Sequence, residues 1–98
     1  LLLMDVESIH EFFNPIKSHL CKYKQYLDSC GLTPVEGALS FVQNIDEIDY
    51  VVIGTNDLQQ LRTNLESLNK PYHSPSLEGF KKFALDDHRY LNPGLWKI

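Results

Sequence analysis

Residues 50–58 read YVVIGTNDL, an apolar run that breaks into small polar residues. The run at 50–53 is uninterrupted, rich in β-branched residues and bounded by Asp49 and Gly54. This pattern predicts a strand buried on both faces, as in a parallel sheet. A strand that ends in a glycine and short polar side chains can build a ligand site. Taken alone, the stretch is more typical of a plain turn between a strand and a helix.

A helix is predicted directly after this turn. Asp57 can cap its first turn, and Gln60 stands at the reciprocal position of a capping box. Leucines at helical spacing form one apolar face that we expect to be buried; they are Leu58, Leu61, Leu65 and Leu68. The Asn-Lys-Pro sequence at 69–71 should end the helix.

An earlier helix is predicted over residues 15–30. Asn14 and Pro15 supply a cap and a first-turn proline. One apolar face repeats every three or four residues; it comprises Ile16, Leu20, Tyr23, Leu27 and Cys30. Gly31 should end the helix in the left-handed conformation.

A further helix should begin just after Gly31. Thr33 and Glu36 form a capping box, with Pro34 at the first helical position. Its apolar face comprises Val35, Ala38, Leu39, Val42 and Ile45. Gly37 inside this helix costs about 1 kcal/mol relative to alanine, which indicates close packing at that point. Asn44 should close the helix.

Length and charge exclude several classes of function. The chain has 98 residues, enough for one small domain, and a net charge of −4. Two helices joined through Gly31 resemble the outline of a helix-turn-helix, yet the second helix carries no Lys or Arg. Without basic side chains the affinity for phosphate is lost. We therefore expect neither nucleic acid nor an anionic membrane surface as a partner.

The cysteines and the N-terminal residues indicate a cytoplasmic protein. Cys21 and Cys30 lie nine residues apart on one predicted helix, about 13 Å by helical rise, which is too far for a disulfide. The apolar run LLLM at 1–4 is too short for a signal peptide or a membrane span. We expect the chain to be cut from a longer one, just after a buried strand.

The remaining reactive residues form no recognisable catalytic or metal site. No two of the four histidines have the i,i+4 spacing of a helical metal site. The sequence at 86–88, Asp-Asp-His, favours a solvated charge run. Tyr23 belongs to an apolar helix face and is predicted to lie in the core. We therefore name no catalytic residue and no metal ligand.

Four pieces of this sequence resemble the C-terminal part of the aldo/keto reductases. They are LLLM at 1–4, GLTPVEGALSFVQN at 31–44, IDYVVIGTND at 48–57 and QLRTNL at 60–65. Family members show a G-x-T-P-x-x-x-A-L helix, a strand ending in Val-Ile-x-Gly, and then Q-L-x-x-N. The spacing from Gly54 to Gln60 and Asn64 fits this pattern without a gap.

The resemblance implies an α/β fold, the C-terminal portion of a (β/α)₈ TIM barrel. Members of the family are barrels of about 250 residues. The 98 residues would form a single partial domain, with the last two to three βα units at 1–70 and a C-terminal helix and tail at 71–98. Residues 50–53 would be the eighth strand, 57–68 the eighth helix, and 76–85 an appended helix. One strand, 50–53, is expected in an otherwise mostly helical segment.

The resemblance also implies part of a site for NADP(H) or NAD(H). In the family, the loop after the eighth strand and the following helix hold the adenosine-phosphate end of the cofactor. Carried over, Gly54, Asn56 and Gln60 would contact the ribose phosphate, and Asn64 the adenine. Thr55 offers a hydrogen-bonding side chain in the same loop. At Thr63 many relatives have Glu, another adenine contact.

The reaction implied is hydride transfer to a small carbonyl substrate, an aldehyde or a ketone. The catalytic Asp, Tyr, Lys and His of the family have no counterpart among residues 1–98, so we expect these residues alone to be inactive. We also expect them to self-associate, because a barrel fragment leaves its lone strand and the inner faces of its helices exposed. The alternative is a small free-standing helical module that binds a protein partner and catalyses nothing. A compact monomer with a cooperative melt would favour this alternative.

Overall fold

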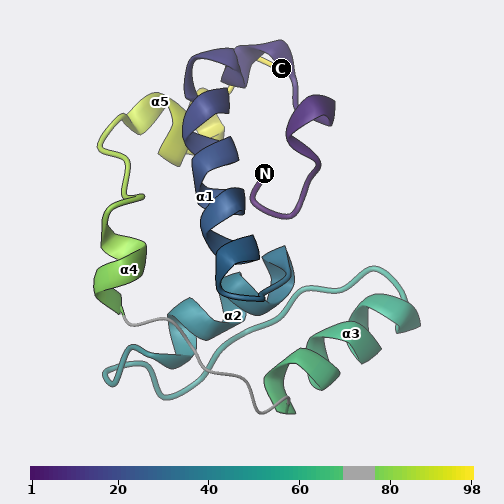
Figure 1. Cartoon of the computed structure of the whole chain (residues 1–98). Helices are drawn as coiled ribbons and strands as arrows, with labels where there is room; N and C mark the ends of the chain where they lie inside the picture. The colour runs from purple at the N-terminus through teal and green to yellow at the C-terminus, as the bar shows by residue number, and fades with distance from the viewer. Residues whose placement is uncertain (70–76) are drawn as a thin grey trace.

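The computed structural model describes residues 1–69 and 77–98, which fold as short helices arranged around one central helix (Figure 1). Helix α1 is the longest of them and contacts η1, η2 and α2. In chain order the elements are η1 (Val6–Ser8), η2 (Glu11–Ile16), α1 (Lys17–Ser29), α2 (Pro34–Gln43), α3 (Leu58–Asn69), α4 (Leu77–Lys81), α5 (His88–Leu91) and η3 (Pro93–Leu95).

The end of α1 follows the sequence prediction closely. Gly31 has a φ of +71°, the left-handed conformation that glycine adopts most easily. The Gly31 amide donates to the Asp28 carbonyl at 3.0 Å, and the Leu32 amide donates to the Leu27 carbonyl at 2.9 Å. These two bonds form a Schellman motif. The predicted start is wrong, because Pro15 lies inside η2 and Ile16 caps α1 without a side-chain hydrogen bond.

Helix α2 begins as its capping box predicts. The Glu36 amide donates to Thr33 Oγ1 at 3.2 Å, and Pro34 occupies the first turn. The close packing expected at Gly37 is confirmed, because this glycine lies directly against the side chain of Leu27. Asn44 forms the C-cap. The α1–α2 corner is therefore fixed by local hydrogen bonds and by one close contact.

Two hydrophobic clusters lie along α1. The first gathers residues from both ends of the chain: Val6, Ile9, Phe13, Ile16, Leu20 and Tyr90. Trp96 packs edge-on against Phe13 with ring centroids 5.0 Å apart, and its Nε1 donates to the Tyr90 carbonyl at 3.2 Å. The second cluster lies near α2 and α4 and comprises Tyr23, Leu27, Leu32 and Phe80. The apolar face predicted for residues 16–27 is thus buried as expected.

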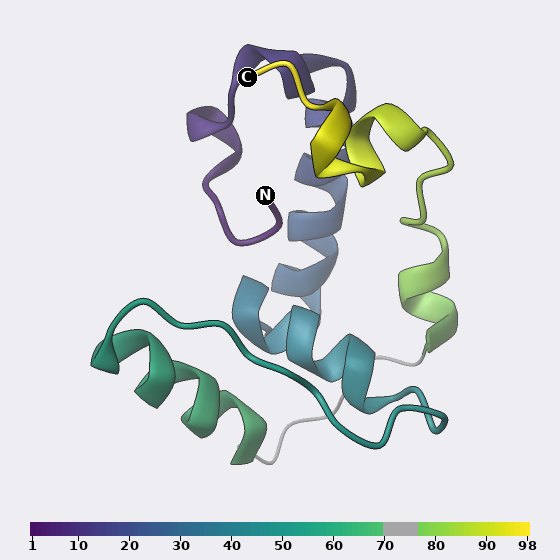
Figure 2. The same cartoon turned by 180° about the vertical axis from the view of Figure 1, so that it is seen from behind.

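The predicted strand at 50–53 is wrong. Across residues 1–69 and 77–98 no strand forms, and 50–53 runs as irregular, exposed backbone between α2 and α3 (Figure 2). A strand requires a neighbouring segment that completes its backbone hydrogen bonds. Within the described ranges no such segment pairs with it.

The α/β fold class that the resemblance implies is wrong as well. The described residues form a small helical domain around α1, not the C-terminal portion of a (β/α)₈ barrel. The helix expected at 57–68 is present as α3, and the one expected at 76–85 is present in shorter form as α4. The boundary expected at 70/71 lies outside the described residues.

The orientation of α3 also differs from its prediction. Its leucines were expected in the core, but Leu58, Leu61 and Leu65 are exposed. The helix instead packs on α2, with the small residue Ser67 buried on its inner side. Without a sheet to cover, the apolar face of α3 has no counterpart among the described residues.

Candidate functional site

Four of the six residues predicted to bind a cofactor line one cavity. It has a volume of about 270 Å³, and its lining comprises Leu3, Val35, Gly54, Gln59, Gln60, Thr63 and Asn64. Thr55 and Asn56 do not line it and are exposed. The space beside Gly54 is open, with no atom within 4 Å of a Cβ placed there. The site lies between the irregular segment at residues 50–57 and the first two turns of α3.

The first turn of α3 is held by a reciprocal hydrogen-bonded cap. The Gln60 amide donates to Asp57 Oδ1 at 2.8 Å, and Gln60 Oε1 accepts from the Asn56 amide at 2.9 Å. The capping role predicted for Asp57 is therefore confirmed, whereas Gln60 accepts from the amide of Asn56, one residue before the position that a capping box predicts. This cap orients the Gln60 side chain next to Gly54, so one residue serves both the local fold and the cavity.

The electrostatics of the cavity favour a neutral, hydrogen-bonding ligand group. None of the described residues that line it is charged. The positive end of α3 already has the Asp57 carboxylate as its partner, which opposes a second anion there. Arg62, on the same helix, lines a different cavity. The Asn64 side-chain amide offers both a donor and an acceptor that can recognise a base or a hydroxyl, and Gln60 adds its side-chain N–H donors, because its Oε1 already accepts from the Asn56 amide.

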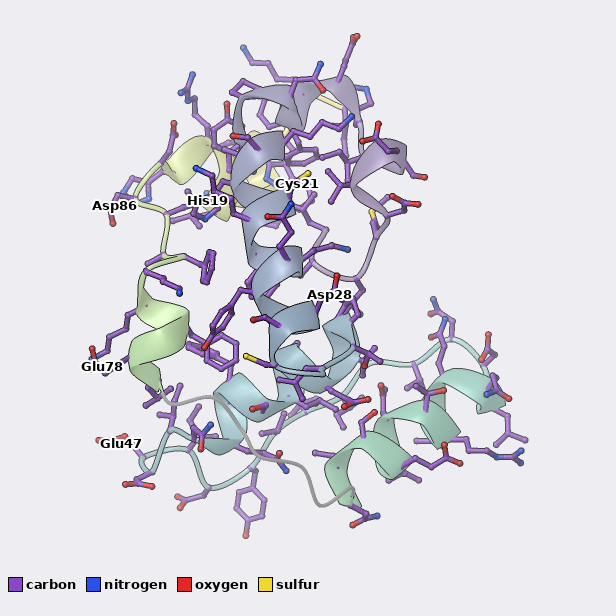
Figure 3. The ribbon with its side chains drawn as sticks, viewed as in Figure 1. His19, Cys21, Asp28, Glu47, Glu78 and Asp86 are labelled. Atoms are coloured by element: carbon purple, nitrogen blue, oxygen red, sulfur yellow. The ribbon has the colours of Figure 1, made fainter. Side chains whose placement is uncertain are left out.

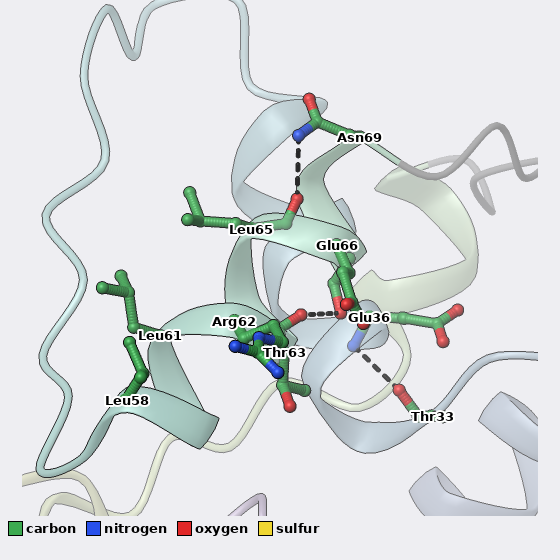
Figure 4. Close-up of a pocket in the computed structure, with 10 residues that line it drawn as sticks. Thr33, Glu36, Leu58, Leu61, Arg62, Thr63, Leu65, Glu66 and Asn69 are labelled. Atoms are coloured by element: carbon green, nitrogen blue, oxygen red, sulfur yellow. Dashed lines mark hydrogen bonds between the residues drawn. The ribbon is translucent and has the colours of Figure 1, made fainter.

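A larger, open cavity of about 750 Å³ lies on the neighbouring side of α3 (Figure 4). Its lining combines leucines with charged and polar side chains: Thr33, Glu36, Leu58, Leu61, Arg62, Thr63, Leu65, Glu66, Ser67 and Asn69. Sequence reasoning missed this surface because it assigned the leucines to the core. A signal was present: Thr63 and Ser67, four apart on the opposite face, are small enough to let α3 approach α2.

Two of the histidines have structural partners. His19 Nε2 lies 2.7 Å from the Phe83 carbonyl oxygen and points toward the segment between α4 and α5 (Figure 3). His10 Nδ1 accepts from the Phe12 amide at 3.1 Å and caps η2. Among the described residues no group of His, Cys, Asp and Glu could hold a metal ion. His73 lies outside them.

The two other groups considered from sequence are also structural. Tyr23 is buried in the second cluster, and burial raises its pKa. A raised pKa disfavours the phenolate, so Tyr23 behaves as a core residue. Asp87 caps α5 and binds the Arg89 guanidinium at 2.6 Å, which lowers the pKa of its carboxyl. The run at 86–88 is thus a helix cap with an exposed ion pair.

Comparisons with known proteins leave the family open. No family model, no curated protein and no solved structure matches this chain. Within the described parts of the chain, no helix has the length and apolar character needed to cross a membrane.

Proposed function

We propose that this chain supplies part of a nicotinamide-cofactor site, for NADP(H) or NAD(H), in an oxidoreductase that reduces aldehydes or ketones by hydride transfer. The observation that carries the proposal is the cavity shared by Gly54, Gln60, Thr63 and Asn64. The resemblance of residues 31–68 to the aldo/keto reductases implies six cofactor-binding positions, and the cavity brings four of them together.

The adenosine end of the cofactor suits this cavity best. Asn and Gln side chains can hydrogen-bond adenine through two groups at once, and Gln60 and Asn64 lie four residues apart on one helix face. A volume of about 270 Å³ lies just below the range of about 300–1,000 Å³ typical of ligand pockets. The cavity would therefore hold one part of a dinucleotide, with the nicotinamide and the substrate contacted by other residues.

The chemistry of the reaction belongs to residues that we do not find here. Hydride transfer requires an acid beside the substrate carbonyl and a nicotinamide held over it. Among residues 1–69 and 77–98, no titratable side chain lines the cavity, so its role in this proposal is binding alone. We place the chain in the cytoplasm as part of the same proposal. Cys21 and Cys30 are free thiols, as is usual in a reducing compartment.

A nuclear magnetic resonance titration of the 98-residue chain tests the proposal. Adenosine and NADH should shift the backbone amides of Gly54, Gln60 and Asn64, whereas guanosine should not. Asn64→Leu should abolish these shifts. Gln25→Leu is the matched control, because Gln25 is exposed on α1, far from the cavity in sequence. Equal shifts in the Asn64→Leu variant, or none with either adenine probe, would overturn the proposal.

A second candidate function is a protein-interaction module without catalysis. The observation that favours it is the exposed leucine face of α3 beside the larger cavity. Exposed apolar surface of this kind commonly marks an association site. Sedimentation of the chain at increasing concentration tests this candidate: association that disappears when the leucines are made polar supports it. A monomer that binds the adenine probes supports the first candidate.

A further inference from the structure

Among residues 1–69 and 77–98, the two most exposed large apolar side chains lie within the segment 50–53. Tyr50 and Val52 are 91% and 97% exposed, whereas Val51 is 41% exposed and Ile53 is half-buried. This alternation is the period of an extended chain, in which successive side chains point to opposite sides. The segment thus has the side-chain pattern of a strand, although it has no pairing partner within the described ranges.

The backbone of the same segment is also unpaired. Within residues 1–69 and 77–98, no hydrogen bond is made by the amides or carbonyls of residues 50–53. An extended segment with free amides and carbonyls is a template for another strand. Both views show the connection from α2 to α3 passing between these two helices (Figures 1 and 2).

The charge around this segment has one sign. Between Lys24 and Arg62 the chain carries no basic side chain. The charged side chains of the connection between α2 and α3 are all acidic and exposed: Asp46, Glu47, Asp49 and Asp57. Glu47 points away from the body of the domain (Figure 3). A strand that pairs with residues 50–53 would therefore meet carboxylates near both of its ends.

We propose that residues 50–53 are the docking edge for a β-strand of a partner protein, an apolar strand with Lys or Arg at its ends. Backbone hydrogen bonds would provide the attachment, and the side chains of Tyr50 and Val52 would select apolar residues opposite them. Basic ends would complement Asp49 and Asp57. A second copy of this chain is the less suitable occupant, because pairing two such segments brings two sets of carboxylates together.

This inference is independent of cofactor binding, because residues 50–53 do not line the cavity of Gly54 and Asn64. The probes are two synthetic strand peptides with the same alternating Val-Thr core, one with lysines and one with glutamates at its ends. Binding to the full chain is followed by amide shifts. The lysine peptide should bind about 5- to 30-fold more tightly, the effect of reversing two exposed charge pairs, and added salt should reduce this preference.

Proline variants separate strand pairing from simple apolar contact. Adjacent amides of a strand point to opposite edges, so Val51→Pro and Val52→Pro remove donors from the two edges in turn. At least one of them should weaken the lysine peptide about 2- to 12-fold, the effect of one lost hydrogen bond. Val52→Thr is the matched control, because it keeps the amide and the β-branch. Circular dichroism should show an intact fold, since Val52 is exposed.

Three results would overturn the inference. Equal binding of the two peptides would show that basic ends are not recognised. Unchanged binding in both proline variants would show that the backbone amides of residues 51 and 52 do not pair with the peptide. A concentration-dependent dimer that both proline variants dissolve would identify a second copy as the occupant. Loss of adenine-probe binding with peptide binding retained would instead count only against the cofactor proposal.

Discussion

The side chain of Leu27 fills the space beside Gly37, where α1 and α2 meet. A Cβ placed on Gly37 would lie 2.6 Å from Leu27 Cδ2 and 2.9 Å from Leu27 Cδ1. Leu27 is almost completely buried, so its side chain has little room to move. Because α1 carries both hydrophobic clusters, this contact fixes the angle between the central helix and the part of the chain that leads to the candidate site.

Gly37→Ala should destabilise the domain despite the better helix propensity of alanine. The gain in propensity is about 1 kcal/mol, whereas overpacking of a close contact costs about 1–3 kcal/mol. We expect a net loss of up to about 2 kcal/mol from the free energy of unfolding in urea. In a Leu27→Ala background the same change should be neutral or stabilising, since the clash is gone. Equal effects in both backgrounds would show that the contact is unimportant.

Asp57→Ala should destabilise α3 more than the rest of the chain. The mutation removes the acceptor of the Gln60 amide and a favourable charge at the helix N-terminus. Loss of such a cap costs about 0.5–2 kcal/mol. Faster amide hydrogen exchange in α3, with α1 unchanged, is the expected measurement. Asp46→Ala is the control, because this exposed residue precedes the irregular segment. Uniform acceleration across the chain would contradict a local cap.

Local signals predicted the helices well because each depends on nearby residues. Gly31 and Thr33 mark the corner between α1 and α2 through glycine conformation and side-chain capping, which are decided within four residues. The same is true of Asp57 and Gln60. Nothing about these caps requires a particular tertiary fold, so they would be present in a barrel segment and in a helical domain alike.

The errors came from tertiary inference. An apolar run such as 50–53 predicts burial only if other chain segments cover it, and the described residues contain no sheet. The leucines of α3 were assigned to the core for the same reason. For the candidate site, the spacing of Gly54, Gln60 and Asn64 correctly predicted residues that come together. The positions of Thr55 and Asn56 depend on the path of the loop, which spacing does not determine.

Burial of the Tyr23 side chain should make stability fall at alkaline pH. Burial raises the pKa of Tyr23 above its ordinary value of 10.0, so the folded state holds its proton more tightly than the unfolded state. Stability is therefore complete below pH 10.0 and declines as the pH rises toward the folded-state pKa, by at most about 1.4 kcal/mol per pH unit. Tyr23→Phe should decline less steeply. Parallel curves for the two proteins would exclude this contribution.

Replacing the exposed leucines of α3 should separate a surface role from a core role. Leu58, Leu61 and Leu65 are 69%, 40% and 49% exposed, and exposed positions usually tolerate substitution within about 0.5 kcal/mol each. The triple change to glutamine should therefore preserve the fold and reduce binding of a hydrophobic dye. Leu39→Ala, at a buried site on α2, should cost about 2–5 kcal/mol by comparison. Unfolding of the triple variant would contradict this prediction, because it would show that the three leucines are buried and that α3 packs through its apolar face.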